Sequence, residues 1–244
     1  MLTETEQAII AICQATKYRY GHRKVRALLK KEYQIIHHRN TVQAIMQKHG
    51  LQCRVKPKRK WKAQGETILV APDLLQRQFQ ADRPNQKWVT DITYIPYGNT
   101  VQYLSTIIDL YNNEIVAFKL YDHQQVPIVL DTLKEALARR AYPTGVLLHS
   151  DQGSVYTSHA FQAYMTAHHV RSSMSRRGNC WDNAVIESFH STLKSEEFAY
   201  TKHHSLKQTE VSSRISHYLH HYNEERIQQK LDYLSPIEYG KKAA

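Results

Sequence analysis

The order of the apolar patterns from Lys87 onward constrains the fold of this 244-residue chain more than any other feature. Polarity alternates with a two-residue period in three successive segments, which predicts three antiparallel strands. These strands cover residues 87–95, 101–109 and 115–120, and the pairs Gly98-Asn99 and Asn112-Asn113 supply the turns between them.

Helix and strand patterns then alternate over the rest of this region. A helix pattern starts at Val126, and Ser158 can cap a second helix that runs to about His168. Apolar runs within 146–151 and 170–174 predict two more strands, and Asp182 or Asn183 can cap a third helix. This order predicts an α/β fold, a mixed sheet flanked by helices.

Three shorter helix patterns precede the predicted sheet. They cover residues 5–15, residues 22–31, and a segment that Asn40 or Thr41 can cap and that Gly50 can end. Two short helices after a leading one, with a basic exterior, predict a small all-helical domain of helix-turn-helix type. A plain three-helix bundle is the alternative.

The positive charge of the chain is concentrated at its N-terminal end. Residues 1–62 hold 15 Lys or Arg and three acidic residues, whereas residues 63–244 hold 18 and 19. Such asymmetry favours a polyanionic partner, most simply DNA, over a merely soluble basic surface. The residues predicted to contact DNA here are Arg23, Lys24 and Arg26 on the second helix and Lys56, Lys58, Arg59, Lys60 and Lys62 beyond the third.

The segment 54–62 holds six basic residues in nine, together with Pro57. Self-repulsion and the proline disfavour a packed element, so we predict an extended linker that follows DNA phosphates. A solvated tether without DNA contact is the alternative.

The cysteines and the apolar runs indicate the compartment. Cys13, Cys53 and Cys180 stand far apart, which disfavours a disulfide framework or a zinc ribbon and fits a reducing cytosol. The longest apolar stretches have the length of strands. We therefore predict a cytoplasmic protein with no membrane partner.

Three carboxylates define a candidate catalytic site. Asp91 lies within a predicted strand, Asp151 ends another, and Glu187 lies on a predicted helix after 35 intervening residues. Phosphodiester chemistry requires such a set, because hard oxygen ligands must hold two Mg²⁺ ions about 3.5–4 Å apart. Lys194 follows Glu187 by nearly two helical turns, so both share one face and the lysine can grip a phosphate. Arg176 and Arg177 either touch DNA or stay solvated.

Several sequence blocks carry a family resemblance. WVTDITY at 88–94, HSDQGSVY at 149–156 and SRRGNCWDNAVIESF at 175–189 resemble the OrfB transposases of the IS-three family, most closely its IS150-like branch. YNEER at 222–226 and LSP at 234–236 are similar to the C-terminal signature of that family. The resemblance extends over essentially the whole chain.

The resemblance implies a retroviral-integrase-like core of ribonuclease-H fold, preceded by a helix-turn-helix region. The acidic triad of the family falls on Asp91, Asp151 and Glu187, and the basic residue on its glutamate helix falls on Lys194. The zinc-binding His/Cys set of retroviral integrases has no counterpart here, so we expect no zinc. In this family an upstream frame, OrfA, is typically joined to OrfB, so an OrfA partner or fusion is expected.

These observations predict a DNA transposase that catalyses Mg²⁺-dependent strand cleavage and strand transfer at insertion-sequence ends. Mn²⁺ should substitute for Mg²⁺, and at least two copies of the chain should hold double-stranded DNA ends and target. The rival functions are a ribonuclease-H-fold nuclease that cuts without joining, and a catalytically inactive DNA-binding regulator. The predicted regions are a helix-turn-helix-like domain at 1–52, a basic linker at 53–80, a catalytic core at 81–200 and a helical extension at 201–244.

Overall fold

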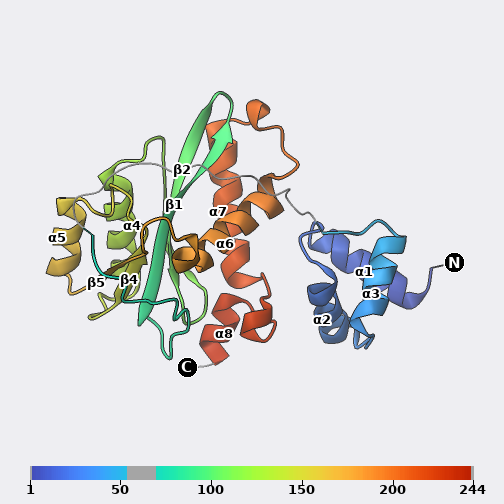
Figure 1. The fold of residues 1–244 in the computed structure, drawn as a ribbon. Helices are drawn as coiled ribbons and strands as arrows, with labels where there is room; N and C mark the ends of the chain where they lie inside the picture. The colour runs from blue at the N-terminus through green and yellow to red at the C-terminus, as the bar shows by residue number, and fades with distance from the viewer. Residues whose placement is uncertain (1, 54–69, 243–244) are drawn as a thin grey trace.

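The computed structural model describes residues 2–53 and 70–242. Five strands form one sheet in the order β3-β2-β1-β4-β5 (Figure 1). Their bounds are β1 Lys87–Tyr97, β2 Thr100–Asp109, β3 Ile115–Tyr121, β4 Leu147–Ser150 and β5 Arg171–Met174. β1, β2 and β3 pair antiparallel, whereas β1 with β4 and β4 with β5 pair parallel. The predicted mixed sheet is confirmed.

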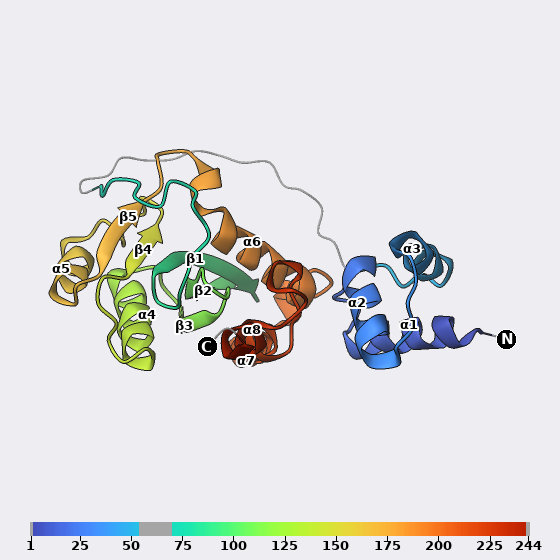
Figure 2. The same ribbon diagram turned by 90° about the horizontal axis from the view of Figure 1, so that it is seen from below.

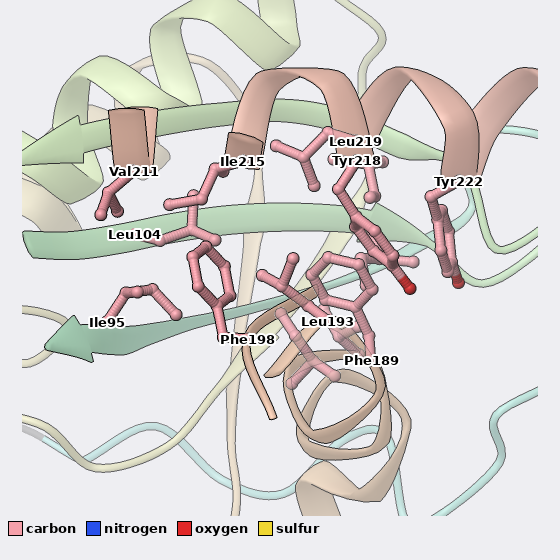
Figure 3. Packing of buried hydrophobic residues seen from close by; sticks show 14 of the residues in the cluster. Ile95, Leu104, Phe189, Leu193, Phe198, Val211, Ile215, Tyr218, Leu219 and Tyr222 are labelled. Atoms are coloured by element: carbon pink, nitrogen blue, oxygen red, sulfur yellow. The ribbon is translucent and has the colours of Figure 1, made fainter. Parts of the chain in front are cut away.

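Helices cover both faces of this sheet. On one face α4 (Val126–Arg139) and α5 (His159–Ala167) enclose a core around Trp88 and Ile107. On the other face α6 (Ala184–Leu193) and α7 (Gln208–Glu224) pack against Val89, Ile95 and Leu104. Figure 3 shows how α7 lays Val211, Ile215 and Leu219 over β1 and β2, while Phe189 and Leu193 of α6 meet it from below.

Residues 70–80, which the sequence assigns to the linker, lie against the core. Leu75 is 1% exposed and belongs to the α6–α7 side of the core. The backbone N–H groups of Leu74 and Leu75 donate to Ser173 Oγ, at 2.9 and 3.2 Å. The buried Leu75 side chain and the Ser173 hydroxyl of β5 therefore hold this part of the segment against the core. The predicted phosphate-contacting residues from Lys56 to Lys62 lie outside the described residues.

The N-terminal domain consists of α1 (Glu4–Ala15), α2 (His22–Tyr33) and α3 (Arg39–Lys48). The helix α1 begins with a capping box between Thr3 and Glu6. The cap of α3 is His38 instead of the predicted Asn40 or Thr41, because the His38 ring accepts from the Asn40 N–H. The domain encloses its own core, which includes Ile9 and Leu29.

The C-terminal region joins the two parts of the molecule. It contains the helices η3 (His203–Ser205) and η4 (Gln229–Leu231) and the helix α8 (Pro236–Lys242). Ile227 packs into the core of the N-terminal domain, and its N–H donates to Tyr20 Oη at 3.1 Å. Arg19 Nη2 pairs with Glu197 Oε2 at 2.6 Å. In Figure 2, α2 is accordingly the N-terminal helix that faces the end of α6 and the C-terminal segment.

Among residues 2–53 and 70–242, no helix is both long enough and apolar enough to cross a lipid bilayer.

Candidate active site

The strand register brings Asp91 and Asp151 together. β1 and β4 run parallel with Val89 opposite His149. Asp91 lies two residues after Val89 within β1, and Asp151 lies two residues after His149, just past the end of β4. The alternation of side chains therefore directs both to the same face of the sheet, from neighbouring segments about 4.8 Å apart. The shared face is the one that α6 covers.

The helix α6 adds the third carboxylate. His190, buried on α6, places Nδ1 3.5 Å from Asp91 Oδ2 and Nε2 3.0 Å from Thr106 Oγ1. Glu187 lies one turn before His190, so it occupies the same side of the helix. The contact between His190 and Asp91 therefore holds this side of α6, which carries Glu187, against the part of the sheet that carries Asp91.

The electrostatics show that the three carboxylates influence one another. Burial, followed by the charge of Asp91, raises the pKa of Asp151 to about 6 from its ordinary value of 3.8. Partial burial and then the charges of Asp91 and Asp151 raise the pKa of Glu187. Such shifts mean that a cation would bind favourably at the site. Its positive charge would offset the cost of the buried negative charges and the repulsion between them.

A buried tyrosine lies near the acidic pair. Tyr156 is 1% exposed, and its hydroxyl lies 3.4 Å from Thr90 Oγ1. Burial and the charges of Asp91 and Asp151 raise the pKa of Tyr156. The Tyr156 ring packs edge-on against Phe161 of α5, which anchors the loop after β4.

A glycine allows the loop after β4 to fold back on Asp151. The Gly153 N–H donates to Asp151 Oδ1 at 2.8 Å, and a Cβ atom at Gly153 would meet the same oxygen at 2.8 Å. The close approach therefore requires glycine. The Gly153 N–H thereby holds one of the two oxygens of the Asp151 carboxylate.

The donor chemistry fits a divalent cation with oxygen ligands. Three carboxylates and no imidazole or thiolate ligand set is the pattern that Mg²⁺ prefers. Among the residues that the structure describes, no three His, Cys, Asp or Glu side chains surround a single point closely enough to hold one ion. The three carboxylates are therefore close enough for their charges to act on one another, and do not enclose a single ion position among the described residues.

Comparison with known proteins identifies the family. An "Integrase core domain" model matches residues 81–180, a second model of that description matches 168–236, and an "HTH-like domain" model matches 3–59. The chain is 38% identical to the transposase InsK of insertion element IS150 from Escherichia coli, over 97% of this chain and 82% of that protein. It belongs to the IS-three family of insertion-sequence transposases.

Other relatives agree with this assignment. A transposase-like protein of Haemophilus influenzae is 42% identical over 81% of this chain and 90% of its own length. An intasome structure of simian T-cell lymphotropic virus superposes with a TM-score of 0.58 at 17% identity, over 93% of this chain and 73% of that one. The HTLV-2 integrase catalytic core, solved with magnesium, gives 0.52 at 16% identity over 65% and 98%. The ribonuclease-H-like fold and the helix-turn-helix-like domain of the transposase are thereby confirmed.

The predicted DNA-binding residues of the transposase lie in different surroundings. Arg23 and Arg26 are exposed on α2, whereas Lys24 on the same helix is partly buried with its Nζ 4.8 Å from the Tyr20 ring centre. Lys194 Nζ lies 4.7 Å from the ring centre of the exposed Tyr94, at the start of the π-helical turn η2 (Lys194–Phe198). The residues Lys56, Lys58, Arg59, Lys60 and Lys62 lie outside the described part.

Arg176 holds the loop that leads to Glu187. Its Nε and Nη2 atoms donate to Asp182, both at 2.9 Å, and Arg77 Nε donates to the same carboxylate at 2.7 Å. Asp182 is fully buried, and its bonds to Arg176 and Arg77 hold its pKa well below the usual range. The expected capping bond of α6 is therefore absent in this described segment: Asn183 occupies the cap position without a side-chain bond, because Asp182 binds the two arginines instead.

Sequence reasoning missed three residues of the site: His190, Asp182 as an arginine acceptor, and Arg77. His190 could have been found, because it lies one turn after Glu187 on an already predicted helix. Arg77 lies in a segment without a periodic pattern, and its partner is 105 positions away in the sequence. Arg177 is exposed, and its contact with DNA stays a prediction.

The raised pKa of Asp151 predicts that Asp151→Asn stabilises the metal-free transposase at pH 7. The folded chain protonates Asp151 at a pH of about 6, and its ordinary value is 3.8. The penalty of the charged form is therefore complete above pH 6, shrinks as the pH falls and disappears below about pH 4. Discounted for partial exposure, about 2 kcal/mol remains, which raises the melting temperature by about 5 °C.

Thermal unfolding of both proteins at pH 7 and at about pH 4 checks this stability difference. The gain of the variant should vanish at the lower pH, and Mg²⁺ should raise the melting temperature of the wild type more than that of Asp151→Asn. Equal melting temperatures of the two proteins at pH 7 would contradict the placement of Asp151 beside Asp91.

Proposed function

We propose that this transposase cuts and joins DNA strands through two Mg²⁺ ions held by Asp91, Asp151 and Glu187. The observation that carries the proposal is the pairing of Asp91 and Asp151 on adjacent chain segments, where the charge of Asp91 raises the pKa of Asp151 and the charges of both raise the pKa of Glu187. The magnesium in the HTLV-2 integrase core structure, a protein of the same fold, supports the choice of ion. Mn²⁺ should replace it, whereas a zinc site is not proposed.

The residues of the chain have distinct tasks in this mechanism. When bound, the ions would activate a water or a DNA 3′-hydroxyl as the nucleophile and would stabilise the charge on the leaving 3′-oxygen of an in-line displacement. Asp91 and Asp151 would hold both ions, and Glu187 would complete the second position. His190 would keep Asp91 in place, and Lys194, which stands over the exposed Tyr94 ring, would hold a phosphate of the DNA. A covalent protein–DNA intermediate is not required.

The features around the triad favour this activity over its rivals. A nuclease that only cuts needs no N-terminal DNA-binding domain, whereas here that domain is joined to the core by Tyr20 and Arg19. A catalytically inactive regulator would have no reason to keep three mutually repelling carboxylates, because their burial destabilises the fold.

The partners follow from the reaction. Joining a DNA end to another site requires two ends in one complex, so we propose that at least two copies of the chain act together on double-stranded element ends and target in the cytoplasm. The dimeric and trimeric forms in which the HTLV-2 core was solved support assembly of this fold. An OrfA partner or fusion is proposed as the additional source of end recognition.

A strand-transfer assay tests the proposed reaction. Labelled duplexes ending in the inverted repeats of the element are incubated with the transposase, a supercoiled target and Mg²⁺. We expect joined products that migrate above the input duplex, formed by a complex whose measured mass corresponds to two or more chains. Cleaved ends without any joined product would favour the nuclease, and unchanged duplex with normal DNA binding would favour the regulator.

A further inference from the structure

A cavity of about 420 Å³ lies where the N-terminal domain meets the helix that carries Glu187. Lys24 of α2 forms one side, Ser188 and Thr192 of α6 form another, and Arg226 and Lys230 of the C-terminal segment close it. Three separate regions of the chain thus contribute to one hollow next to the candidate active site.

The lining of this cavity is cationic. Its described residues include Lys24, Arg226 and Lys230 but neither Asp nor Glu. Arg226 is compensated from behind by Glu196, whose Oε1 lies 2.7 Å from Arg226 Nη2. The two lysines have weaker compensation, because Lys24 stands over the Tyr20 ring and Lys230 Nζ donates to the Phe79 carbonyl at 3.3 Å.

The electrostatics of the lysines agree with a missing anion. Burial, and then the nearby Arg226, lowers the pKa of Lys24 to about 7, although Glu196 acts in the opposite direction. Burial also lowers the pKa of Lys230. Both shifts arise because the charged forms are partly withdrawn from water without an equivalent counter-charge.

Neutral donors complete the cavity. The hydroxyl-bearing residues Ser188 and Thr192 line it, together with Gln228. Gln228 is held in place because its Oε1 atom accepts from Asn113 Nδ2 at 3.0 Å. Ammonium, hydroxyl and amide donors together are the groups that bind phosphate oxygens.

We propose that this junction cavity binds one backbone phosphate of the DNA, through Lys24, Lys230 and the adjacent hydroxyls. The inference rests on the proposed function in taking DNA as the ligand. It goes beyond it by assigning a phosphate site that spans both parts of the molecule. Because Glu187 lies on α6, a phosphate held between α2 and α6 would set the position of the DNA relative to Glu187. The same phosphate would tie that DNA to the N-terminal domain through α2.

The test combines protein variants with single modifications of the DNA. Element-end duplexes that carry one uncharged methylphosphonate, moved position by position, are titrated with wild type and with the double variant Lys24→Gln/Lys230→Gln. We expect one position at which the modification weakens binding to the wild type but not to the double variant. The slope of log affinity against log salt should also fall by about 0.9 in the double variant.

Matched controls separate a phosphate site from a structural role. Lys134→Gln removes a lysine from α4, on the opposite face of the sheet, and should leave the slope and the sensitive position unchanged. Lys230→Gln alone, at an exposed residue, keeps the Tyr20 contact of Lys24 and should show part of the effect. The proposal would be overturned if the effects of the methylphosphonate and of the double variant on affinity were additive at every position. It would also be overturned if the double variant had a lowered melting temperature but an unchanged salt slope.

Two further outcomes distinguish the source of the phosphate and the link to catalysis. In one outcome, inorganic phosphate binds the wild type as well as DNA does, and no methylphosphonate position has a specific effect. The cavity would then be a site for free phosphate, and the proposal would be overturned. The binding measurements do not depend on catalysis. Absence of strand transfer by the wild type would therefore refute the proposed function alone. Binding losses from the methylphosphonate and from the double variant that simply add would refute the junction site alone.

Discussion

Replacing any one of the three carboxylates should abolish strand cleavage and joining while leaving DNA binding intact. For Asp91→Asn, Asp151→Asn and Glu187→Gln we expect strand transfer to fall by at least about 10³-fold, because each change removes a ligand from a two-metal site. The affinity for duplex DNA should stay within about threefold of the wild type, since the basic N-terminal surface is unchanged.

Two controls make the triad result specific. Asp182→Asn changes a nearby buried acid that contacts Arg77 and Arg176 instead of the ion site, so it should lower thermal stability without raising the Mg²⁺ concentration needed for half-maximal activity. Substituting Mn²⁺ should not restore the triad variants. If one triad variant joined DNA at a rate close to that of the wild type, that residue would have to be removed from the site.

Removing residues 1–62 should weaken binding to duplex DNA by about 10²- to 10³-fold and flatten its salt dependence. The segment holds 15 of the 33 Lys and Arg residues but only three of the 22 acidic ones. Each lost phosphate contact lowers the slope of log affinity against log salt by about 0.9. Fluorescence anisotropy titrations at several salt concentrations measure both quantities.

The deletion also removes Tyr20 and Arg19, which contact Ile227 and Glu197. A matched variant, Arg23→Gln/Arg26→Gln, changes only exposed residues of α2 and preserves these contacts. It should reduce the affinity in the same direction by a smaller amount. An unchanged salt slope after the deletion would place the DNA-binding surface elsewhere on the molecule.

The sequence predicted the elements of the core because local patterns determine them. The alternation in β1 to β3, the helix pattern from Val126 in α4 and the Ser158 cap of α5 all depend on residues within a few positions of one another. The positions of Asp91 at mid-strand and of Asp151 at a strand end depend on the same patterns. Their pairing across β1 and β4 could be expected from the family resemblance.

The other features arise from contacts between distant parts of the chain. Leu75 is buried because the core offers an apolar site next to β5, which no local pattern of residues 70–80 reveals. Lys24 looks like an exterior residue of an amphipathic helix, but the C-terminal segment covers that side of α2. Asp182 satisfies two arginines instead of capping α6, and Arg226 pairs with Glu196 across a separation of 30 residues.

Anomalous diffraction from crystals of the transposase bound to an element-end duplex and grown with Mn²⁺ tests the central claim most directly. The account predicts two anomalous peaks at the face that β1, β4 and α6 share, both in contact with Asp91 and Asp151 and the second also in contact with Glu187. Crystals of Glu187→Gln should lose the second peak and keep the first. Well-ordered DNA beside the three carboxylates with no anomalous peak between them would contradict the account.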